Sequence, residues 1–377
     1  MSLLDAPYRY TKLQKTLLAL LGVVIFLLFW WAMAEFLSDQ KPIGIENSRM
    51  PSSLDEHPDS IALRKELLLK DSLALANASE YEKFYPLLPP PHEVLGVIPG
   101  MIRDDDGLRG SVLYHAWVSI WRNLQGYFWA VFFSLLIGIP VAISTLGRAL
   151  FSRLIDVLRY VPLTALIVVW FLIFSAEQKE AFKISFLAFG ILVYLLPVVM
   201  QRIWETEDVY LKTAYTLGAS DWQLIKSVYL PALMSKLIDD IRVLTAISWT
   251  YIIIAESYYR DVGLGSYIYL MDRFGDKSRV FAVLLIIVLI GFLQDQLFAY
   301  MNRRLFPYRT VKSVSPGLRE TRNGFLVILG VIMLYLLITL FTGPVPILGF
   351  IVAIVVAAAA LLIIFGEYKL YAKAQND

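Results

Sequence analysis

Long apolar blocks separated by polar and charged segments dominate the pattern along this chain of 377 residues. A helix needs about 20 mostly apolar residues to cross a bilayer. The first block is too long, and lacks the small-residue cleavage site, to be a removed signal peptide. The pattern therefore predicts an all-α membrane protein, a polytopic helical bundle. Eight spans are expected, at residues 16–37, 125–146, 156–175, 183–201, 238–257, 280–300, 324–342 and 346–366.

The distribution of Lys and Arg predicts the orientation of these spans, because short cytoplasmic loops carry an excess of both residues. Two segments are rich in them and are expected in the cytoplasm, with six crossings between them. The segment between the first two spans is acidic and is expected outside. Within it, residues 60–76 have helical periodicity, and the proline-rich stretch 85–91 is expected to be extended. The basic residues are Arg9, Lys12 and Lys15 at the N-terminus and Arg303, Arg304, Arg309, Lys312, Arg319 and Arg322 after the sixth span; the acids include Asp55, Glu56, Asp59, Asp104, Asp105 and Asp106.

One block, LKTAYTLGASDWQLIKSVYLPALM at residues 211–234, is far less apolar than its neighbours. Thr206 is expected to cap a first helix, whose face carries Tyr210, Ala214 and Leu217. Gly218 suits a left-handed end to that helix.

Ser220 and Gln223 have the spacing of a capping box that opens a second helix. Trp222, Ile225 and Tyr229 share its apolar side, and Pro231 is expected to end or kink it. The pattern predicts two short amphipathic helices hinged at a glycine. They fit either an interfacial loop that packs on its own spans or a rigid knob presented to a soluble partner.

The spacing within this block resembles the signature of permease subunits of ABC importers, which reads EAA, then Gly, then nine residues, then I-x-Leu-Pro. Here Gly218 is followed after nine residues by Val228, and Leu230-Pro231 ends the motif. The opening triplet differs, because Lys212-Thr213-Ala214 replaces the leading Glu and the first Ala.

The resemblance extends over residues 84–309 and points to permeases of the nitrate, sulfonate, taurine and bicarbonate type. Kept positions include Pro162 and Ala165, then Arg242, Trp249, Ala255, Glu256 and the turn Gly263-Leu264-Gly265. The matching stretches are YPLLPPPHEVL, SIWRNLQGYFWAVFFSLLIGIPVAI, IDVLRYVPLTALIVVWFLIF, IRVLTAISWTYIIIAESYYRDVGLGSYIY and GFLQDQLFAYMNRRLFPYR.

The resemblance implies a type I ABC importer permease core in the inner membrane, with both termini cytoplasmic. It further implies a homodimer, two separate ATPase subunits that bind ATP and Mg²⁺, and a periplasmic or lipid-anchored substrate-binding protein. The solute would be a small anion, and the path would run along the dimer interface. The residues expected to couple the chain to the ATPase are Lys212, Thr213, Ala214, Gly218, Ala219, Ser220, Trp222, Val228, Leu230 and Pro231.

The implied organisation comprises an N-terminus with the first span at 1–37, a periplasmic segment at 38–112, a permease core at 113–310 and an added hairpin at 311–377. The coupling helices occupy 206–231 within the core. In the added part, Gly349, Ala353 and Ala357 are spaced by four residues and predict a face that another helix approaches closely.

The composition of the chain argues against several classes of protein and site. Hydrophobic residues make up 58% and charged residues 18%, against about 25% charged in soluble domains. The chain has no cysteine, and its net charge of +2 is too small for a strong nucleic-acid binder. The three histidines (His57, His92 and His115) are dispersed, so we expect no metal site. No phosphate-binding loop motif is present, so ATP hydrolysis is expected in a partner and no cofactor in this chain.

Charges near the spans have two interpretations. Arg242, Asp240, Trp249 and Glu256 could line the translocation path, or the charged residues could form structural ion pairs. In the second case Asp239 or Asp240 would pair with Arg242 or with an arginine of another helix.

Other functions were weighed against import. A secondary transporter would show internal repeats and broken helices at the midplane, and no convincing repeat is present. A membrane enzyme would need converging polar groups within the spans. A non-transporting scaffold derived from such a permease is the remaining alternative.

Overall fold

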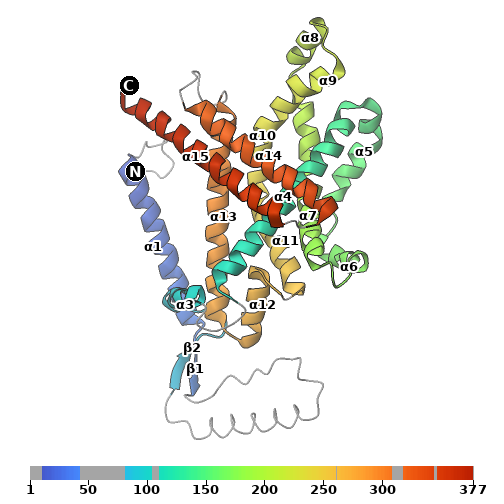
Figure 1. Cartoon of the computed structure of the whole chain (residues 1–377). Helices are drawn as coiled ribbons and strands as arrows, with labels where there is room; N and C mark the ends of the chain where they lie inside the picture. The colour runs from blue at the N-terminus through green and yellow to red at the C-terminus, as the bar shows by residue number, and fades with distance from the viewer. Residues whose placement is uncertain are drawn as a thin grey trace, which may run out of the picture. The chain divides into compact units, whose positions relative to one another are not determined.

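The computed structural model describes residues 11–42, 81–103, 110–259, 261–307, 317–343 and 346–376. Apart from a two-stranded antiparallel sheet, the regular elements of these residues are helices (Figure 1). The chain divides into two compact units, one of residues 1–116 and 260–287 and the other of residues 117–259 and 288–377. The predicted helical periodicity at 60–76, the acidic run 104–106, Arg9, Arg309 and Lys312 lie outside the described residues.

The first unit begins with α1 (Lys12–Phe36), which Thr11 caps in a capping box with Gln14. Strands β1 (Asp39–Pro42) and β2 (Tyr81–Phe84) pair antiparallel. The indole N–H of Trp30 donates to the carbonyl of Pro89 at 3.0 Å, which ties α1 to the segment before α3. The unit also contains α3 (Pro91–Arg103), the start of α4 (Val112–Ile143), α12 (Leu264–Phe274) and the first part of α13 (Lys277–Leu305).

The second unit is built around α7 (Lys179–Trp204), whose side chains Phe182, Leu187 and Leu195 are fully buried. It holds the rest of α4 and α13 together with α5 (Thr145–Leu158), α6 (Leu163–Ile173), α8 (Asp208–Thr216), α9 (Asp221–Leu224), the π-helical turn η2 (Ile225–Tyr229), α10 (Leu230–Val243), α11 (Thr245–Tyr258), α14 (Leu318–Thr342) and α15 (Pro346–Asn376).

Fewer helices than predicted are long and apolar enough to cross a membrane. Among the described residues there are six, or seven if the bent pair α5 and α6 counts as one span. The prediction of eight was wrong, because 238–257 falls across a break at Leu244 between two 14-residue helices. The six are Leu13–Phe36, Val112–Ile143, Lys179–Trp204, Lys277–Leu305, Leu318–Thr339 and Pro346–Ala372.

The predicted span 156–175 is broken as well. α5 ends at Leu158 and α6 begins after Pro162, and the two helices meet at 103°. Proline disfavours helical backbone at the residue before it and has no N–H to donate, so the helix cannot run through this position.

The predicted second span begins much earlier than expected. α4 starts at Val112, not near residue 125, because polar residues of its first half face the protein interior. His115, Ser119 and Arg122 are all buried there. A hydropathy pattern read against lipid counts such residues as breaks, although a membrane helix tolerates them where it is covered by protein.

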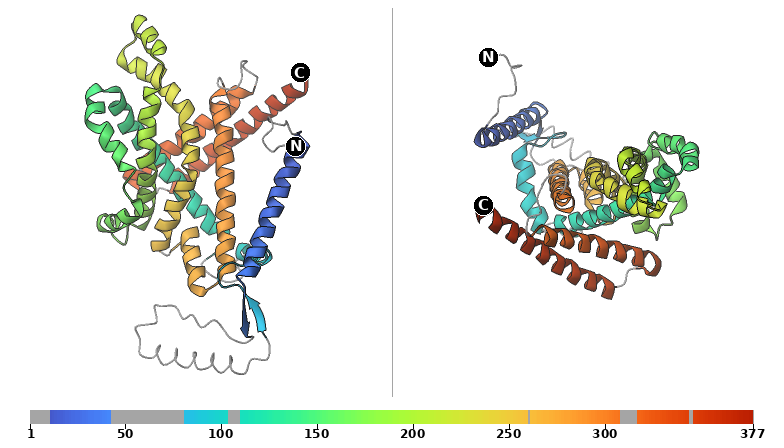
Figure 2. Two further views of the ribbon diagram at one scale, coloured as in Figure 1. Left: turned by 180° about the vertical axis from the view of Figure 1, so that it is seen from behind. Right: turned by 90° about the horizontal axis from the view of Figure 1, so that it is seen from above.

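Helices α14 and α15 form a hairpin whose members lie side by side in both views of Figure 2. Close approach occurs at glycines: a Cβ on Gly324 would lie 2.9 Å from the carbonyl oxygen of Ala359, and one on Gly366 would lie 2.7 Å from that of Gly317. The predicted stripe Gly349, Ala353 and Ala357 does not make this contact, since Ala353 and Ala357 are exposed.

Candidate functional site

The candidate coupling segment, residues 206–231, ends its first helix with a left-handed glycine. Gly218 has φ +77°. Its N–H donates to the carbonyl of Tyr215 at 2.9 Å, and that of Ala219 donates to the carbonyl of Ala214 at 3.0 Å. These two bonds make the Schellman motif that commonly closes helices. The prediction for Gly218 is confirmed.

Ser220 starts the next helix as predicted. Its hydroxyl accepts from the backbone N–H of Gln223, and the Gln223 side chain accepts from the backbone N–H of Ser220 at 2.8 Å. The capping box and the glycine turn together fix the backbone between α8 and α9, because both satisfy groups that helix ends leave unpaired.

Two local predictions are corrected. The N-cap of α8 is Glu207, and the buried hydroxyl of Thr206 has no hydrogen-bond partner. Of the two outcomes predicted for Pro231, an end or a kink, the end is wrong, because the π-helical turn η2 leads directly into α10. There the N–H of Leu230 donates to the carbonyl of Ile225, one residue further back than in an α-helix. Residues 221–243 are therefore one continuous helical run.

The apolar side chains of this segment are mostly uncovered. α8 has no buried residue. Leu217 is 81% exposed and Trp222 is 70% exposed, whereas Ile225 and Tyr229, which are predicted to share an apolar side with Trp222, are partly buried. Leu224 is the side chain that anchors α9 in the unit. Val209, Tyr210 and Tyr215 are exposed as well. An apolar patch of this kind marks an interaction surface.

The residues predicted to couple the chain to an ATPase all lie on this one segment. Lys212, Thr213 and Ala214 belong to α8, and the hydroxyl of Thr213 donates to the carbonyl of Val209 at 2.7 Å. The turn holds Gly218, Ala219 and Ser220; α9 holds Trp222; η2 holds Val228; and α10 opens with Leu230 and Pro231. In Figure 1, α8 and α9 lie beyond the end of α7.

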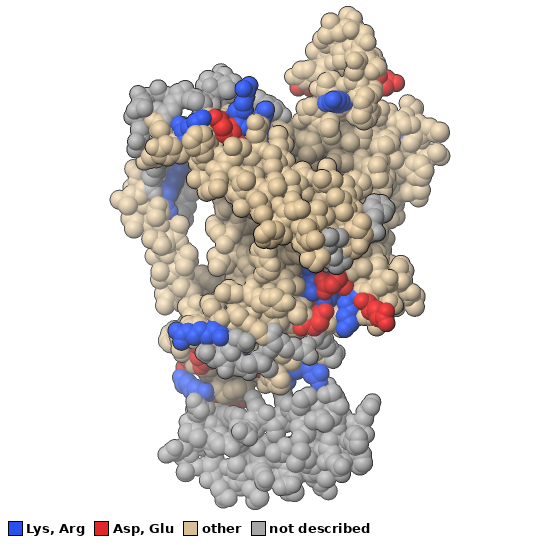
Figure 3. Space-filling model, viewed as in Figure 1, with Lys and Arg blue, Asp and Glu red and all other residues tan. Residues whose placement is uncertain are grey.

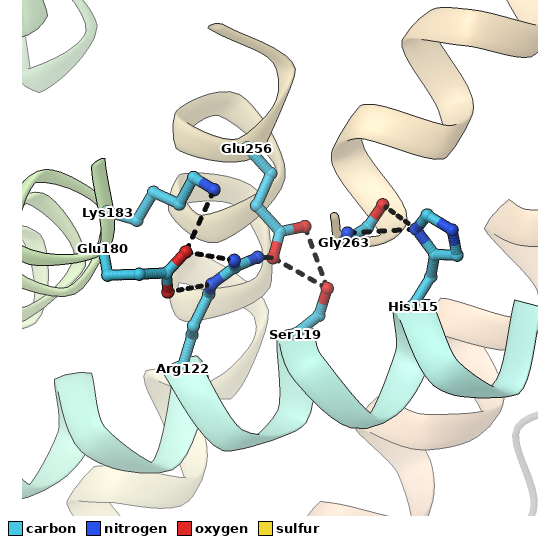
Figure 4. Close-up of polar contacts among 7 residues, drawn as sticks. All are labelled: His115, Ser119, Arg122, Glu180, Lys183, Glu256 and Gly263. Atoms are coloured by element: carbon cyan, nitrogen blue, oxygen red, sulfur yellow. Dashed lines mark hydrogen bonds and ion pairs between the residues drawn. The ribbon is translucent and has the colours of Figure 1, made fainter. Parts of the chain in front are cut away.

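A buried ion-pair cluster lies near the opposite end of α7 (Figure 4). The Arg122 guanidinium, 4% exposed, donates to the carboxylate of Glu256 at 2.8 Å, and Glu256 is fully buried. Its other donors reach Glu180, which is 56% exposed. Ser119 donates to Glu256 at 2.8 Å, and the buried Lys183 ammonium lies 3.4 Å from Glu180. The cluster joins α4, α7 and α11.

Of this cluster, Glu256 is the residue predicted from the sequence as a site residue, whereas Arg122, Glu180, Lys183 and Ser119 are not. The available signal was the presence of charges within apolar stretches, since such charges require a partner. The cluster lies far from the coupling segment along α7. About 24 residues of this helix follow Glu180 before it ends, which is about 36 Å at 1.5 Å per residue.

The other predicted charged residues form pairs between helices. The Arg242 guanidinium donates twice to Asp295 on α13, at 2.9 and 3.0 Å, and lies 3.7 Å from Asp239. Asp240 accepts two bonds from Arg202 on α7, at 2.9 and 2.7 Å. Arg242 and Asp295 are each about one-third exposed, at 32% and 34%. These contacts are ion pairs between helices, as expected in the second of the two interpretations given for the charges near the spans.

Trp249 belongs to a chain of neutral hydrogen bonds across three helices. Its indole N–H donates to Gln294 at 2.9 Å, the Gln294 amide donates to Asn123 at 3.2 Å, and the Asn123 amide donates to Ser248 at 3.1 Å. Trp249, Asn123 and Ser248 are buried. The chain fixes α4, α11 and α13 to one another.

In the first unit, His115 holds the turn before α12. Its Nδ1 accepts from the backbone N–H of Gly263 at 3.0 Å (Figure 4). Gly263 has φ +133°, which only glycine adopts readily. The backbone N–H of Gly263 is therefore already bonded to His115. Among the residues that the structure describes, no group of three His, Asp or Glu side chains could hold a metal ion.

Comparisons with known proteins agree with the fold. The family model of the binding-protein-dependent transport system inner membrane component matches residues 130–307. The taurine transport system permease protein TauC of Escherichia coli is 26% identical over 224 residues, which cover 59% of this chain and 80% of TauC. The putative aliphatic sulfonates transport permease protein SsuC of Bacillus subtilis is 26% identical over 54% of this chain and 72% of its own length.

The nitrate import permease protein NrtB of Leptolyngbya laminosa is 24% identical over 50% of this chain and 67% of its own length. The matched region contains the coupling segment, Arg242 and Glu256, whereas α14 and α15 lie outside it. Over residues 130–307 the chain is similar to the binding-protein-dependent transport system inner membrane components, in agreement with the ABC importer permeases that the sequence motifs predicted.

Proposed function

We propose that this protein forms the membrane path of an ATP-binding-cassette importer for a small organic or inorganic anion, and that α8 and α9 dock on a separate ATPase. The solute class follows the names of the similar permeases, which transport taurine, aliphatic sulfonates or nitrate. A second copy of the chain, two ATPase subunits and an external substrate-binding protein complete the proposed assembly in the inner membrane.

The observation that carries the proposal is a stiff segment with an uncovered apolar surface. The Schellman motif and the capping box fix the turn at Gly218, and the side chains of Leu217 and Trp222 are largely exposed among the described residues. Such side chains serve as anchors when they enter a pocket of a partner. The unbroken helical run from Asp221 to Val243 would carry a displacement of this surface to the ion pairs of α10.

Within this proposal, nucleotide-driven closure of the ATPases moves the coupling segment, and α10 moves with it. The Arg242–Asp295 and Asp240–Arg202 pairs would pass the motion to α13 and α7. Their partial exposure also suits a water-filled path between two copies, because charges on a lipid-facing surface are costly.

The turn offers a test with a matched control. Gly218 and Gly275 both end helices, at φ +77° and +76°, and a Cβ on either would meet nothing within 4 Å. Valine at either position would meet no clash but would have to adopt a left-handed backbone, so both substitutions should cost a similar amount of stability, at least about 1–2 kcal/mol. Gly218→Val should uncouple ATP hydrolysis from transport in proteoliposomes, whereas Gly275→Val should not. Equal transport by both variants would refute the coupling role.

Docking can be tested directly because the chain has no cysteine. Trp222→Cys should cross-link to the ATPase, whereas Leu172→Cys, on the exposed face of α6, should not. A Trp222→Cys protein that transports but never cross-links would favour a different docking surface. A chain that binds the ATPase without moving any solute would favour the scaffold alternative.

A further inference from the structure

The open end of the α14–α15 hairpin is joined to the end of α13 by charged contacts. Glu367 of α15 accepts from Tyr300 at 2.7 Å and from Arg304 at 2.6 Å. Two residues further along α15, Lys369 pairs with Glu320 of α14 at 2.7 Å. These pairs bring the end of α13, the start of α14 and the last part of α15 together.

Three arginines at this place are left facing outward. Arg303 lies beside Arg304 on α13, and Arg319 and Arg322 flank Glu320 on α14; all three side chains are exposed. None of them forms an ion pair with a carboxylate of the described residues, in contrast to Arg304. Figure 3 shows Lys and Arg side chains gathered where α14 begins.

The surface next to the arginines is apolar and aromatic. Leu326 of α14 and Phe365 of α15 are exposed, and so are Tyr368 and Tyr371 near the end of α15. Tyrosine is enriched where a membrane helix meets the headgroup layer. The arginines therefore lie next to a surface suited to acyl chains, near tyrosines of the kind that are enriched at the headgroup layer.

We propose that this end of the hairpin binds the phosphate of an anionic phospholipid. Guanidinium groups match phosphate oxygens with paired hydrogen bonds, and basic clusters between membrane helices bind anionic headgroups. A lipid fits better than a soluble anion, because its acyl chains would cover the exposed apolar faces of α14 and α15. The family match ends at residue 307, so most of the site belongs to a part of the chain outside it.

The test compares lipid retention by the full-length protein and by two variants of equal charge. One is Arg303→Gln with Arg319→Gln and Arg322→Gln. The control removes three exposed cations elsewhere, as Arg153→Gln with Lys179→Gln and Lys226→Gln. Each protein is taken from nanodiscs of phosphatidylcholine and phosphatidylglycerol, and native mass spectrometry counts the phosphatidylglycerol retained.

We expect the affinity for phosphatidylglycerol to fall about fivefold for each of the three arginines removed (Arg303, Arg319 and Arg322). The control variant should retain as much lipid as the wild type. An equal loss in the control would show bulk attraction only and overturn the proposal. Undiminished retention in the hairpin variant would also overturn it. Competition by inorganic phosphate as strong as by the lipid would show a free-anion site instead.

Discussion

Three ion pairs of this protein each join two different helices. Arg122 binds Glu256, Arg202 binds Asp240 and Arg242 binds Asp295. A charge without a partner at the bilayer centre costs about 2.5–3.5 kcal/mol on insertion scales. Pairing is therefore a condition for placing arginine in these helices, and each pair also fixes the register of the two helices it joins.

The most deeply buried pair gives a prediction about stability. Glu256→Gln should lower the free energy of unfolding by about 3 kcal/mol, because it leaves Arg122 with less compensating charge in a buried place. Glu177→Gln, an exposed acid before α7, should change it by less than about 0.5 kcal/mol. Denaturant unfolding in detergent measures both, and equal losses would contradict the structural role of the cluster.

The residue-scale predictions that succeeded depend on local backbone chemistry. Gly218 and Ser220 are recognisable because a left-handed turn and a capping box are formed by residues a few positions apart. The partner of Arg242 could not be chosen from sequence, since Asp295 lies 53 residues away and Asp239 was equally eligible. The exposure of Trp222 depends on tertiary packing around α9, which the residues a few positions away do not determine.

At the scale of elements, apolar blocks predicted most helices but not their limits or breaks. Pro162 could be read as an interruption, yet the 103° bend depends on how α6 packs on α7. The early start of α4 was hidden by His115, Ser119 and Arg122, whose partners come from distant parts of the sequence. Hydropathy describes contact with lipid and cannot anticipate burial by protein.

The hairpin gives a prediction about packing between two elements. Gly324→Ala should destabilise it by about 1–3 kcal/mol, because the added Cβ would lie 2.9 Å from a backbone oxygen of α15. Gly330→Ala, six residues along α14, meets nothing within 4 Å and should cost no packing energy. Amide exchange in α14 and α15 reports the difference, and similar exchange in both variants would contradict the close approach.

For the molecule as a whole, we expect the α14–α15 hairpin to stabilise the folded protein but not to be required for ATPase docking. Ending the chain after Thr310 removes the carboxylate partner of Arg304, so we expect a loss of about 1.5–3 kcal/mol in stability. The coupling segment is untouched, so the ATPase should still bind. Thermal unfolding and pull-down of the ATPase check the two expectations, and loss of ATPase binding would contradict the second.

The π-helical turn before Pro231 adds one residue to the helical run from Asp221 to Val243, compared with a regular α-helix of the same number of turns. A regular α-helix turns by about 100° per residue, so deleting a residue elsewhere in this run would swing Trp222 around the axis and away from its partner. A deletion within 225–229 can instead be absorbed if the wide turn relaxes to an ordinary one. Deletion of Ser227 should therefore preserve coupled transport, whereas deletion of Leu233 should abolish it.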